Sequence, residues 1–171
     1  TVQVKDINTL GSSSPSQLIQ LGASLIFAAD DGINGQELWA TDGTAAGTTL
    51  LKDINSTAAT GSTITQAVLF GSSVLFQAND GTNGAELWIT DGTSSGTILL
   101  KDINPGSGSS SPQNIFVLGS VAYFQANDGT SGAELWRTDG TANGTYLAAD
   151  IASGSGSSSP SNLNALGLSL I

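Results

Sequence analysis

The chain has no cysteine, methionine or histidine among its 171 residues. Without cysteine it can form neither a disulfide framework nor a thiolate nucleophile, and without cysteine and histidine it lacks the usual ligands of a structural zinc ion. The absence of histidine also excludes a Ser-His-Asp catalytic triad. The carboxylates therefore remain as the main candidates for catalysis or metal binding.

Positive charge is scarce as well. Four lysine and arginine residues face 14 aspartate and glutamate residues, which gives a net charge of −10. A protein that binds nucleic acid needs a basic surface to neutralise phosphates, and an anionic membrane surface attracts basic segments for the same reason. No stretch approaches the ~20 apolar residues that span a bilayer. We therefore expect no nucleic-acid partner and no membrane insertion.

What the chain has in abundance is repetition. The string ELWATDGTAAGTTLLKDIN (Glu37 to Asn55) returns as ELWITDGTSSGTILLKDIN (Glu86 to Asn104) and then, loosened, as ELWRTDGTANGTYLAADIA (Glu134 to Ala152). The tryptophans stand at positions 39, 88 and 136, so the period is 49 and then 48 residues. A fixed period of this length is typical of an array of equal structural units.

Each unit reads as strands joined by turns. From Gln66 onward, the runs QAVLF, VLFQAND, GTNGAELWIT and TILLKDI are rich in β-branched and aromatic residues and end at Gly, Asp, Asn or Ser. Such runs predict strands, and no window keeps the 3.6-residue period of a helix. We predict an all-β fold with four strands in each unit. The Ser/Gly-rich stretches, where the unit lengths differ, are expected to be surface loops.

Four strands in 48–49 residues match the blade of a β-propeller, which has about 40–50 residues in common families. A β-solenoid or a stack of sheets is the alternative. We treat residues 1–171 as a single repeat domain. Its repeat-bearing segments are 1–48, 49–97 and 98–145, with a partial segment 146–171.

The tryptophans and the Thr-Asp-Gly-Thr motif each have a structural and a functional interpretation. Trp39, Trp88 and Trp136 are either packing residues between blades or platforms on which a sugar stacks, one in each blade. Leu alternates with Trp along the strand, so both faces of the sheet are apolar, which favours packing.

The Thr-Asp-Gly-Thr motif predicts a hairpin turn, since Asp bonds its own backbone and Gly accepts positive φ. A ligand or cation site at the Asp is the alternative, and the arrangement is similar to the Asp-box turn of other propellers.

A second group of oxygen-bearing side chains recurs around glycines, and Ca²⁺ is the ion that such ligands suit. The alternative is a hairpin turn in which the Asp bonds its own backbone. The spacing does not match an EF-hand. No cofactor is required by either interpretation. The candidate ligands are Asp31, Asn34 and Glu37, then Asp80, Asn83 and Glu86, and then Asp128 and Glu134.

The pattern E-L-W-x-T-D-G-T-x-x-G-T, followed by L-x-K-D-I, resembles the ELWxxDGT repeat family of large bacterial surface and secreted proteins. All three full copies carry E-L-W-x-T-D-G-T-x-x-G-T. The last unit departs from the Lys-Asp-Ile part of the pattern, where it has AADIA. The resemblance implies a β-rich repeat domain in an extracellular or cell-surface setting. It brings with it neither an enzymatic activity nor a defined ligand.

The chain opens in a Lys-Asp-Ile segment, expected as a strand over Thr1–Asn8, and stops early in a further unit. It therefore holds about 3.5 blades, fewer than the usual 4–8 of a closed ring. We expect it to be a fragment of a longer array, a partner in a ring-closing dimer, or a subunit of a head-to-tail assembly.

The predicted function is a non-catalytic extracellular or cell-surface repeat module for adhesion, matrix or scaffolding. A lectin-like propeller with one glycan site in each blade is the alternative. We predict no catalytic residue, because every acid stands at a recurring position or next to one, whereas an enzymatic site on a propeller usually needs residues that break the repeat.

Overall fold

The structure is a computed structural model, and it describes residues 1–57, 60–167 and 169–171. Its core is three four-stranded antiparallel sheets, each a simple meander. The first sheet contains β1 (Ser16–Leu21), β2 (Ser24–Asp30), β3 (Gln36–Thr41) and β4 (Thr49–Lys52). The second contains β5 (Thr65–Phe70), β6 (Ser73–Asn79), β7 (Ala85–Thr90) and β8 (Ile98–Lys101). The third contains β9 (Gln113–Leu118), β10 (Val121–Asn127), β11 (Ala133–Thr138) and β12 (Tyr146–Ala149).

The prediction of an all-β fold with four strands in each unit is confirmed. The described residues contain no helix, and hence none long and apolar enough to cross a membrane. A short hairpin of β13 (Ala165–Leu166) and β14 (Ser169–Leu170) follows the third sheet, with Leu168 outside the described residues. None of the three sheets closes on itself.

The sheets run from residue 16 to 52, from 65 to 101 and from 113 to 149. The repeat-bearing segments 1–48, 49–97 and 98–145 thus each divide a sheet before its last strand. That last strand belongs with the Trp strand that precedes it, because the two pair through Trp39 and Leu50 and through the equivalent residues of the later sheets.

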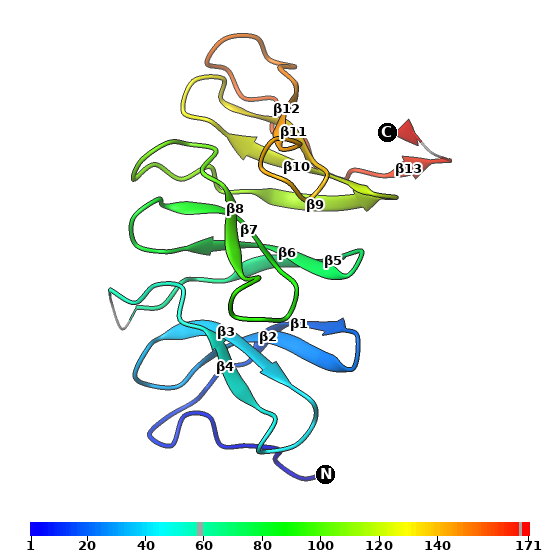
Figure 1. The fold of residues 1–171 in the computed structure, drawn as a ribbon. Coiled ribbons are helices and arrows are strands. Elements are labelled where there is room, and N and C mark those ends of the chain that lie inside the picture. The colour runs from blue at the N-terminus through cyan, green and yellow to red at the C-terminus, as the bar shows by residue number, and fades with distance from the viewer. Residues whose placement is uncertain (58–59, 168) are drawn as a thin grey trace.

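The three sheets stack in a column, with the first at the N-terminal end and the third at the other (Figure 1). Leu38 of the first sheet lies in one hydrophobic cluster with Phe76 and Trp88 of the second. Leu87 of the second sheet shares the next cluster with Trp136 of the third. Side chains alternate along a strand, so the Leu face of one sheet meets the Trp face of its neighbour. Neighbouring sheets come closest at their first strands, β1 with β5 and β5 with β9.

Four Ser/Gly-rich segments run along this column, and we call them straps: residues 5–15, 53–64 (without Ala58 and Ala59), 102–112 and 150–160. The two inner straps, residues 53–64 and 102–112, each bond to the two sheets that they join. The Ser62 amide donates to the Gln36 carbonyl of the first sheet at 2.8 Å, and the Ser62 carbonyl accepts from Asn79 of the second at 2.8 Å. The loops predicted at the surface are therefore also part of the interface between sheets.

The Lys-Asp-Ile strands differ from the prediction: the first does not form, and the later ones are shorter. Residues 1–8 form no strand, because among the described residues no unpaired Trp strand lies beside them, and each Trp strand already pairs with the last strand of its own sheet. In the full units the last strand ends at Lys52 or Lys101, before the Asp. The amide of Ile54 leaves the sheet ladder and donates to the Glu37 carboxylate instead, at 2.8 Å.

Candidate functional site

The Thr-Asp-Gly-Thr motif forms the turn before the last strand of each sheet, as the structural interpretation predicted. In the first copy, the Asp42 carboxylate accepts from the backbone amide of Thr44 at 2.9 Å and from its hydroxyl at 2.7 Å. The Thr41 and Thr48 hydroxyls bond across the turn at 2.7 Å. The final glycine is required, because a Cβ on Gly47 would overlap the Asp42 carboxylate. The same bonds recur in the second and third copies.

The repeated aspartates of this turn are exposed, and the bonds of the turn use only one carboxylate oxygen of each. The pKa values of Asp42, Asp91 and Asp139 are lowered, chiefly by the hydroxyl and amide of the following threonine. These carboxylates are therefore charged at neutral pH and stand one to a sheet.

The three tryptophans lie in the hydrophobic clusters, and each residue is 6% exposed. Trp88 and Trp136 pack between sheets, whereas Trp39 packs with Phe27 and with Ile7 of the first strap. Within the described residues, the indole nitrogens have no hydrogen-bond partner. A ring that stacks on a sugar needs an open face, and these rings would have to become exposed first.

The predicted metal ligands fall into two separate groups. Asp31 forms a tight turn: one oxygen accepts from the Ile33 and Asn34 amides at 2.8 Å, and the other accepts from the Asn34 side chain at 2.8 Å. Asp80 with Asn83 repeats this arrangement, and Asp128 repeats it with Ser131. These bonds lower the pKa of all three aspartates against the opposing effect of burial, which raises it.

The glutamates Glu37, Glu86 and Glu134 point elsewhere. Their side chains are fully buried and accept hydrogen bonds from the strap that leaves their own sheet. Glu86 binds the Ile103 amide at 2.9 Å, the Ser110 amide at 2.7 Å and the Ser110 hydroxyl. In the described part of the chain, no three acidic side chains gather as they would around a metal ion.

The protonation behaviour of these glutamates differs along the column. Burial raises the pKa of Glu37 and Glu86, although their hydrogen bonds act in the opposite direction. Burial also raises the pKa of Glu134, but the bonds from Ser158, Ile151 and Ala152 outweigh it, and the net shift is downward. The same residue type in the same motif therefore has two electrostatic environments.

The lysines of the Lys-Asp-Ile segments connect units rather than pairing with acids. Each donates to a backbone carbonyl in the turn of the next sheet. Lys101, for example, reaches the Thr145 carbonyl at 2.6 Å. The last unit has Ala149 at this position.

Sequence reasoning missed the glutamates as strap anchors. The signal was present, since each Glu is followed 17 residues later by the isoleucine whose amide it binds. A second missed feature is a series of amide side chains at the first strands. Gln17 accepts from the Ala67 amide at 3.0 Å, and Gln66 accepts from the Asn114 amide at 3.1 Å. Gln17, Gln66 and Asn114 all have positive φ, which no spacing in the sequence indicated.

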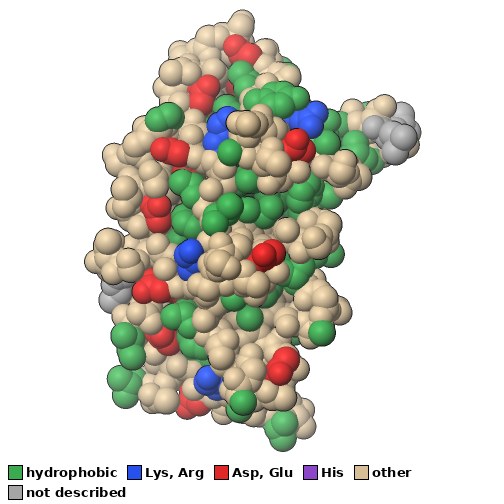
Figure 2. Space-filling view, in the orientation of Figure 1, with side chains coloured by type: hydrophobic (Ala, Val, Ile, Leu, Met, Phe, Trp, Pro, Cys, Tyr) green, Lys and Arg blue, Asp and Glu red, His purple; other side chains and the backbone are tan. Residues whose placement is uncertain are grey.

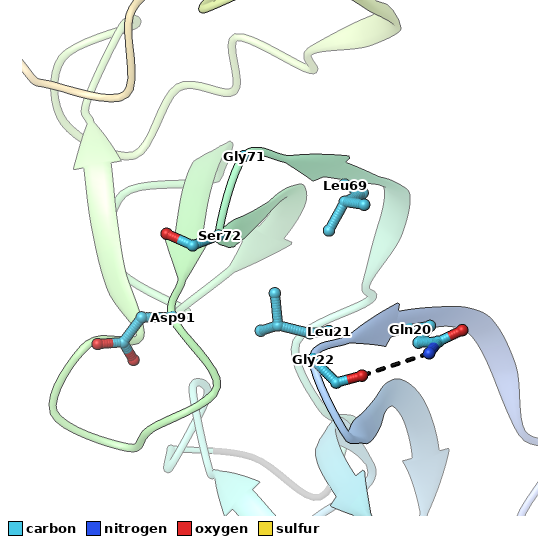
Figure 3. A pocket seen from close by; sticks show the side chains of 7 residues that line it. All are labelled: Gln20, Leu21, Gly22, Leu69, Gly71, Ser72 and Asp91. Atoms are coloured by element: carbon cyan, nitrogen blue, oxygen red, sulfur yellow. Dashed lines mark hydrogen bonds between the residues drawn. The ribbon is translucent and has the colours of Figure 1, made fainter.

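An open groove of about 610 Å³ lies between the first two sheets, at the end where the β1–β2 and β5–β6 turns stand (Figure 3). Leu21 and Leu69 form its apolar part, and Gln20, Ser72 and the exposed Asp91 carboxylate supply polar groups. The volume lies within the range of about 300–1,000 Å³ common to small-molecule sites. The groove could hold a neutral ligand with hydroxyl groups. Figure 2 shows acidic side chains spread along the column rather than gathered in one patch.

Comparisons of the chain with protein-family models, with curated proteins and with solved structures give no match.

Proposed function

We propose that the chain is a non-catalytic repeat module of the extracellular space or the cell surface, which serves adhesion, matrix or scaffolding. One observation carries the proposal: the recurring polar side chains are bonded within the array itself. The repeated Asp closes a turn, the repeated Glu anchors a strap and the repeated Lys reaches the next sheet. Repetition of this kind maintains a rigid platform. The setting rests on the resemblance to the ELWxxDGT repeat family.

The setting can be tested on cells that produce the protein. An antibody against the chain should label intact cells or the medium, and external protease should remove the label. A cytosolic protein serves as the control for leakage. Labelling that requires permeabilised cells would contradict the proposed location without affecting the proposed architecture.

The stacked sheets are proposed to be blades of a propeller-like arc. The closest approach at β1, β5 and β9 supports this geometry, because blades converge at their inner strands. Spin labels on cysteines at Gln20 and Leu69 would measure the separation of the first strands, and labels at Thr49 and Ile98 that of the last strands. The chain has no native cysteine to interfere. A propeller requires the second distance to exceed the first, whereas equal distances indicate a parallel stack.

The groove between the first two sheets supports the alternative of a glycan-binding module. Its hydroxyl, amide and carboxylate groups suit the hydroxyl groups of a sugar, and its leucines suit an apolar ring face. The binding surface would then be the rim of the column rather than the tryptophans.

A glycan array with and without Ca²⁺ tests this alternative. Any sugar that binds should lose affinity in Ser72→Ala and Asp91→Asn, and the second change keeps the oxygen that closes the turn. Asp139→Asn is the matched control, because it makes the same change outside the groove. An array without any binding, or equal loss in the control, would remove the glycan hypothesis.

A further inference from the structure

The groove between the first two sheets has an apolar middle and polar ends. All of its lining residues belong to these two adjoining sheets, so it is a feature of an inner junction of the column. Figure 3 shows Leu21 between Asp91 on one side and Gln20 on the other. Leu69 is 46% exposed, and Ser72 is exposed as well. A ligand in the groove therefore meets an apolar surface that ends at a carboxylate.

The room in this groove depends on the size of one side chain. Leu21 ends the first strand of its sheet, and a Cβ on Gly92 of the next turn would lie 3.1 Å from it. At the following junction Phe70 takes the same place, and a Cβ on Gly140 would lie 2.9 Å from its ring. Leucine is the smaller of the two side chains, so it leaves more space beside the turn that carries Asp91.

Asp91 brings a negative charge and a free oxygen to the end of the groove. The amide and the hydroxyl of Thr93 both donate to the same carboxylate oxygen, at 2.8 and 2.7 Å. These bonds lower the pKa of Asp91, so its carboxylate is ionised at neutral pH. The turn therefore leaves one anionic oxygen available to a ligand.

The cations of the chain are engaged elsewhere. Lys52 reaches the turn of Asp91, but it donates to the Ser94 and Thr97 carbonyls at 3.3 and 2.9 Å. Among the described residues, no cationic side chain contributes to the lowered pKa of Asp91. A counter-charge in the groove must therefore come from another molecule.

The third sheet shows that the same turn accepts a cation nearby. The pKa of Asp139 is lowered chiefly by the hydroxyl and amide of Thr141, and the positive charge of Arg137 lowers it further. The second sheet has Ile89 at the position of Arg137. The turn of Asp91 thus has the same aspartate without the cation that accompanies it in the third sheet.

We propose that the groove binds a lysine side chain on an exposed segment of a partner protein. The aliphatic stem lies over Leu21 and Leu69, as lysine stems commonly cover apolar surface, and the ammonium group pairs with the Asp91 carboxylate. The net charge of −10 attracts a basic segment over a longer distance. This inference names a partner for the adhesion module proposed above and rests on that function.

The groove suits lysine better than arginine or a sugar. Arginine recognises a carboxylate best through two parallel hydrogen bonds, whereas lysine acts as a point charge. One oxygen of Asp91 already holds its turn, so only the other is available. A neutral sugar would leave the charge of Asp91 without a counter-charge. Charge is therefore the property that separates the lysine proposal from the glycan alternative.

An NMR titration of the full ¹⁵N-labelled chain with the peptide acetyl-Gly-Gly-Lys-Gly-Gly-amide tests the proposal. The backbone signals of Gly22, Gly71 and Ser72 should shift, with a dissociation constant of about millimolar size, because one exposed ion pair contributes little. The same peptide with Nε-acetyllysine should bind about two- to fivefold more weakly, because it keeps the stem and loses the charge. The arginine peptide should bind no more tightly than the lysine peptide.

Two variants and one control locate the site. Asp91→Asn keeps the oxygen that closes the turn and should weaken binding about two- to fivefold. Leu21→Phe should weaken binding too, because it introduces the side chain found at Phe70. Asp139→Asn is the matched control outside the groove and should bind like the wild type. Thermal unfolding confirms that each variant is folded.

Absent shifts, equal binding of the acetylated peptide, tighter binding of the arginine peptide or equal loss in Asp139→Asn would each overturn the proposal. A glycan that binds in the groove where the lysine peptide does not would favour the alternative occupant and overturn it as well. The titration uses purified protein, so its outcome is independent of where antibody labels the chain on cells. A failure of the lysine site and a failure of the proposed location are therefore distinguishable.

Discussion

The second and third sheets carry almost the same motif in two surroundings. Glu86 and Glu134 bind their straps through equivalent atoms, yet the pKa of Glu86 is raised and that of Glu134 is lowered. Leu87 is fully buried, whereas Leu135 is only half-buried. What differs is the sheet that follows. The repeated motif therefore determines the hydrogen bonds between the glutamate and its strap. The neighbouring sheet determines how deeply the leucine is buried and in which direction the pKa of the glutamate shifts.

The sequence changes in step with this difference. Lys101 and Asn104 of the strap after the second sheet become Ala149 and Ala152 after the third. Lys101 reaches the turn of the next sheet, and the Asn104 side chain lies beside Gly129 of that sheet. Two of the residues that connect a sheet to its successor are thus replaced by alanine after the third sheet.

Removal of a tryptophan should have the largest effect and should separate an inner interface from the end. Trp88→Ala deletes a buried side chain between two sheets and should lower the free energy of unfolding by about 3–5 kcal/mol. Trp39→Ala should cost less, because its cluster is smaller: Phe27 and Ala29 are its other buried members, and only Ile7 and Leu50 pack against it. Urea denaturation followed by circular dichroism measures both. Equal losses would show that the strap alone supports the outer face as well as a whole sheet does.

The glutamates offer a comparison with less packing change. In Glu86→Gln the new amide group would face the donors from Ile103 and Ser110, so we expect a loss of about 1–3 kcal/mol at neutral pH. Glu134→Gln should cost less, because within the described residues no further four-stranded sheet covers the strap that binds Glu134, and Ile151 of that strap is 60% exposed. Denaturation at pH 7 measures both changes. A larger loss at Glu134 would contradict the expectation that the more exposed strap contributes less, since Ile151 is 60% exposed and Ile103 only 4%.

The pH dependence of these losses should have opposite signs. A raised pKa means that Glu86 stabilises the fold most below its unfolded pKa of about 4.5, and that part of this stabilisation is lost as pH rises through the folded value. A lowered pKa means that Glu134 stabilises most above about 4.5, and that this is lost as pH falls. The cost of Glu86→Gln should therefore grow in acid, whereas that of Glu134→Gln should shrink. Denaturation at several pH values from 3 to 7 gives the two trends, and parallel trends would contradict the assignment.

The strand content and the turns could be predicted because both depend on local chemistry. Alternating apolar residues near Trp88 and the Asp-Gly pair of each turn act within a few residues, so the sequence displays them directly. The packing interpretation of tryptophan followed from its alternation with leucine, and the structure places the rings in the clusters.

The straps could not be predicted in the same way. Ser62 bonds to two sheets, and Gln17 bonds to Ala67, which is 50 residues away. Neither residue type signals such a partner, because serine and glutamine are as common in solvated loops. The groove at Asp91 likewise depends on how two sheets stack, and no motif indicates that arrangement.

A smaller effect is expected from the lysine that connects the second sheet to the third. Lys101→Met keeps the aliphatic stem and removes the bond to the Thr145 carbonyl, so it should cost about 0.5–1.5 kcal/mol. The reverse change at the end of the column, Ala149→Lys, should stay within about 0.5 kcal/mol of the wild type, as exposed substitutions usually do. Thermal unfolding of both variants gives the comparison. A clear gain from Ala149→Lys would show that this end already has a carbonyl within reach.

The smallest effect is expected from removal of divalent cations. Both carboxylate oxygens of Asp31 and of Asp80 already accept hydrogen bonds from their own turn, and the nearby glutamates face the straps. An ion would have to displace these bonds, so chelation with EDTA should leave the melting temperature unchanged, and added Ca²⁺ should not raise it. Magnesium at the same concentration controls for ionic strength. A rise specific to Ca²⁺ that disappears in Asp80→Asn would show that the turn opens to bind the ion, and it would make the Asp-Gly turn a binding element in addition to a structural one.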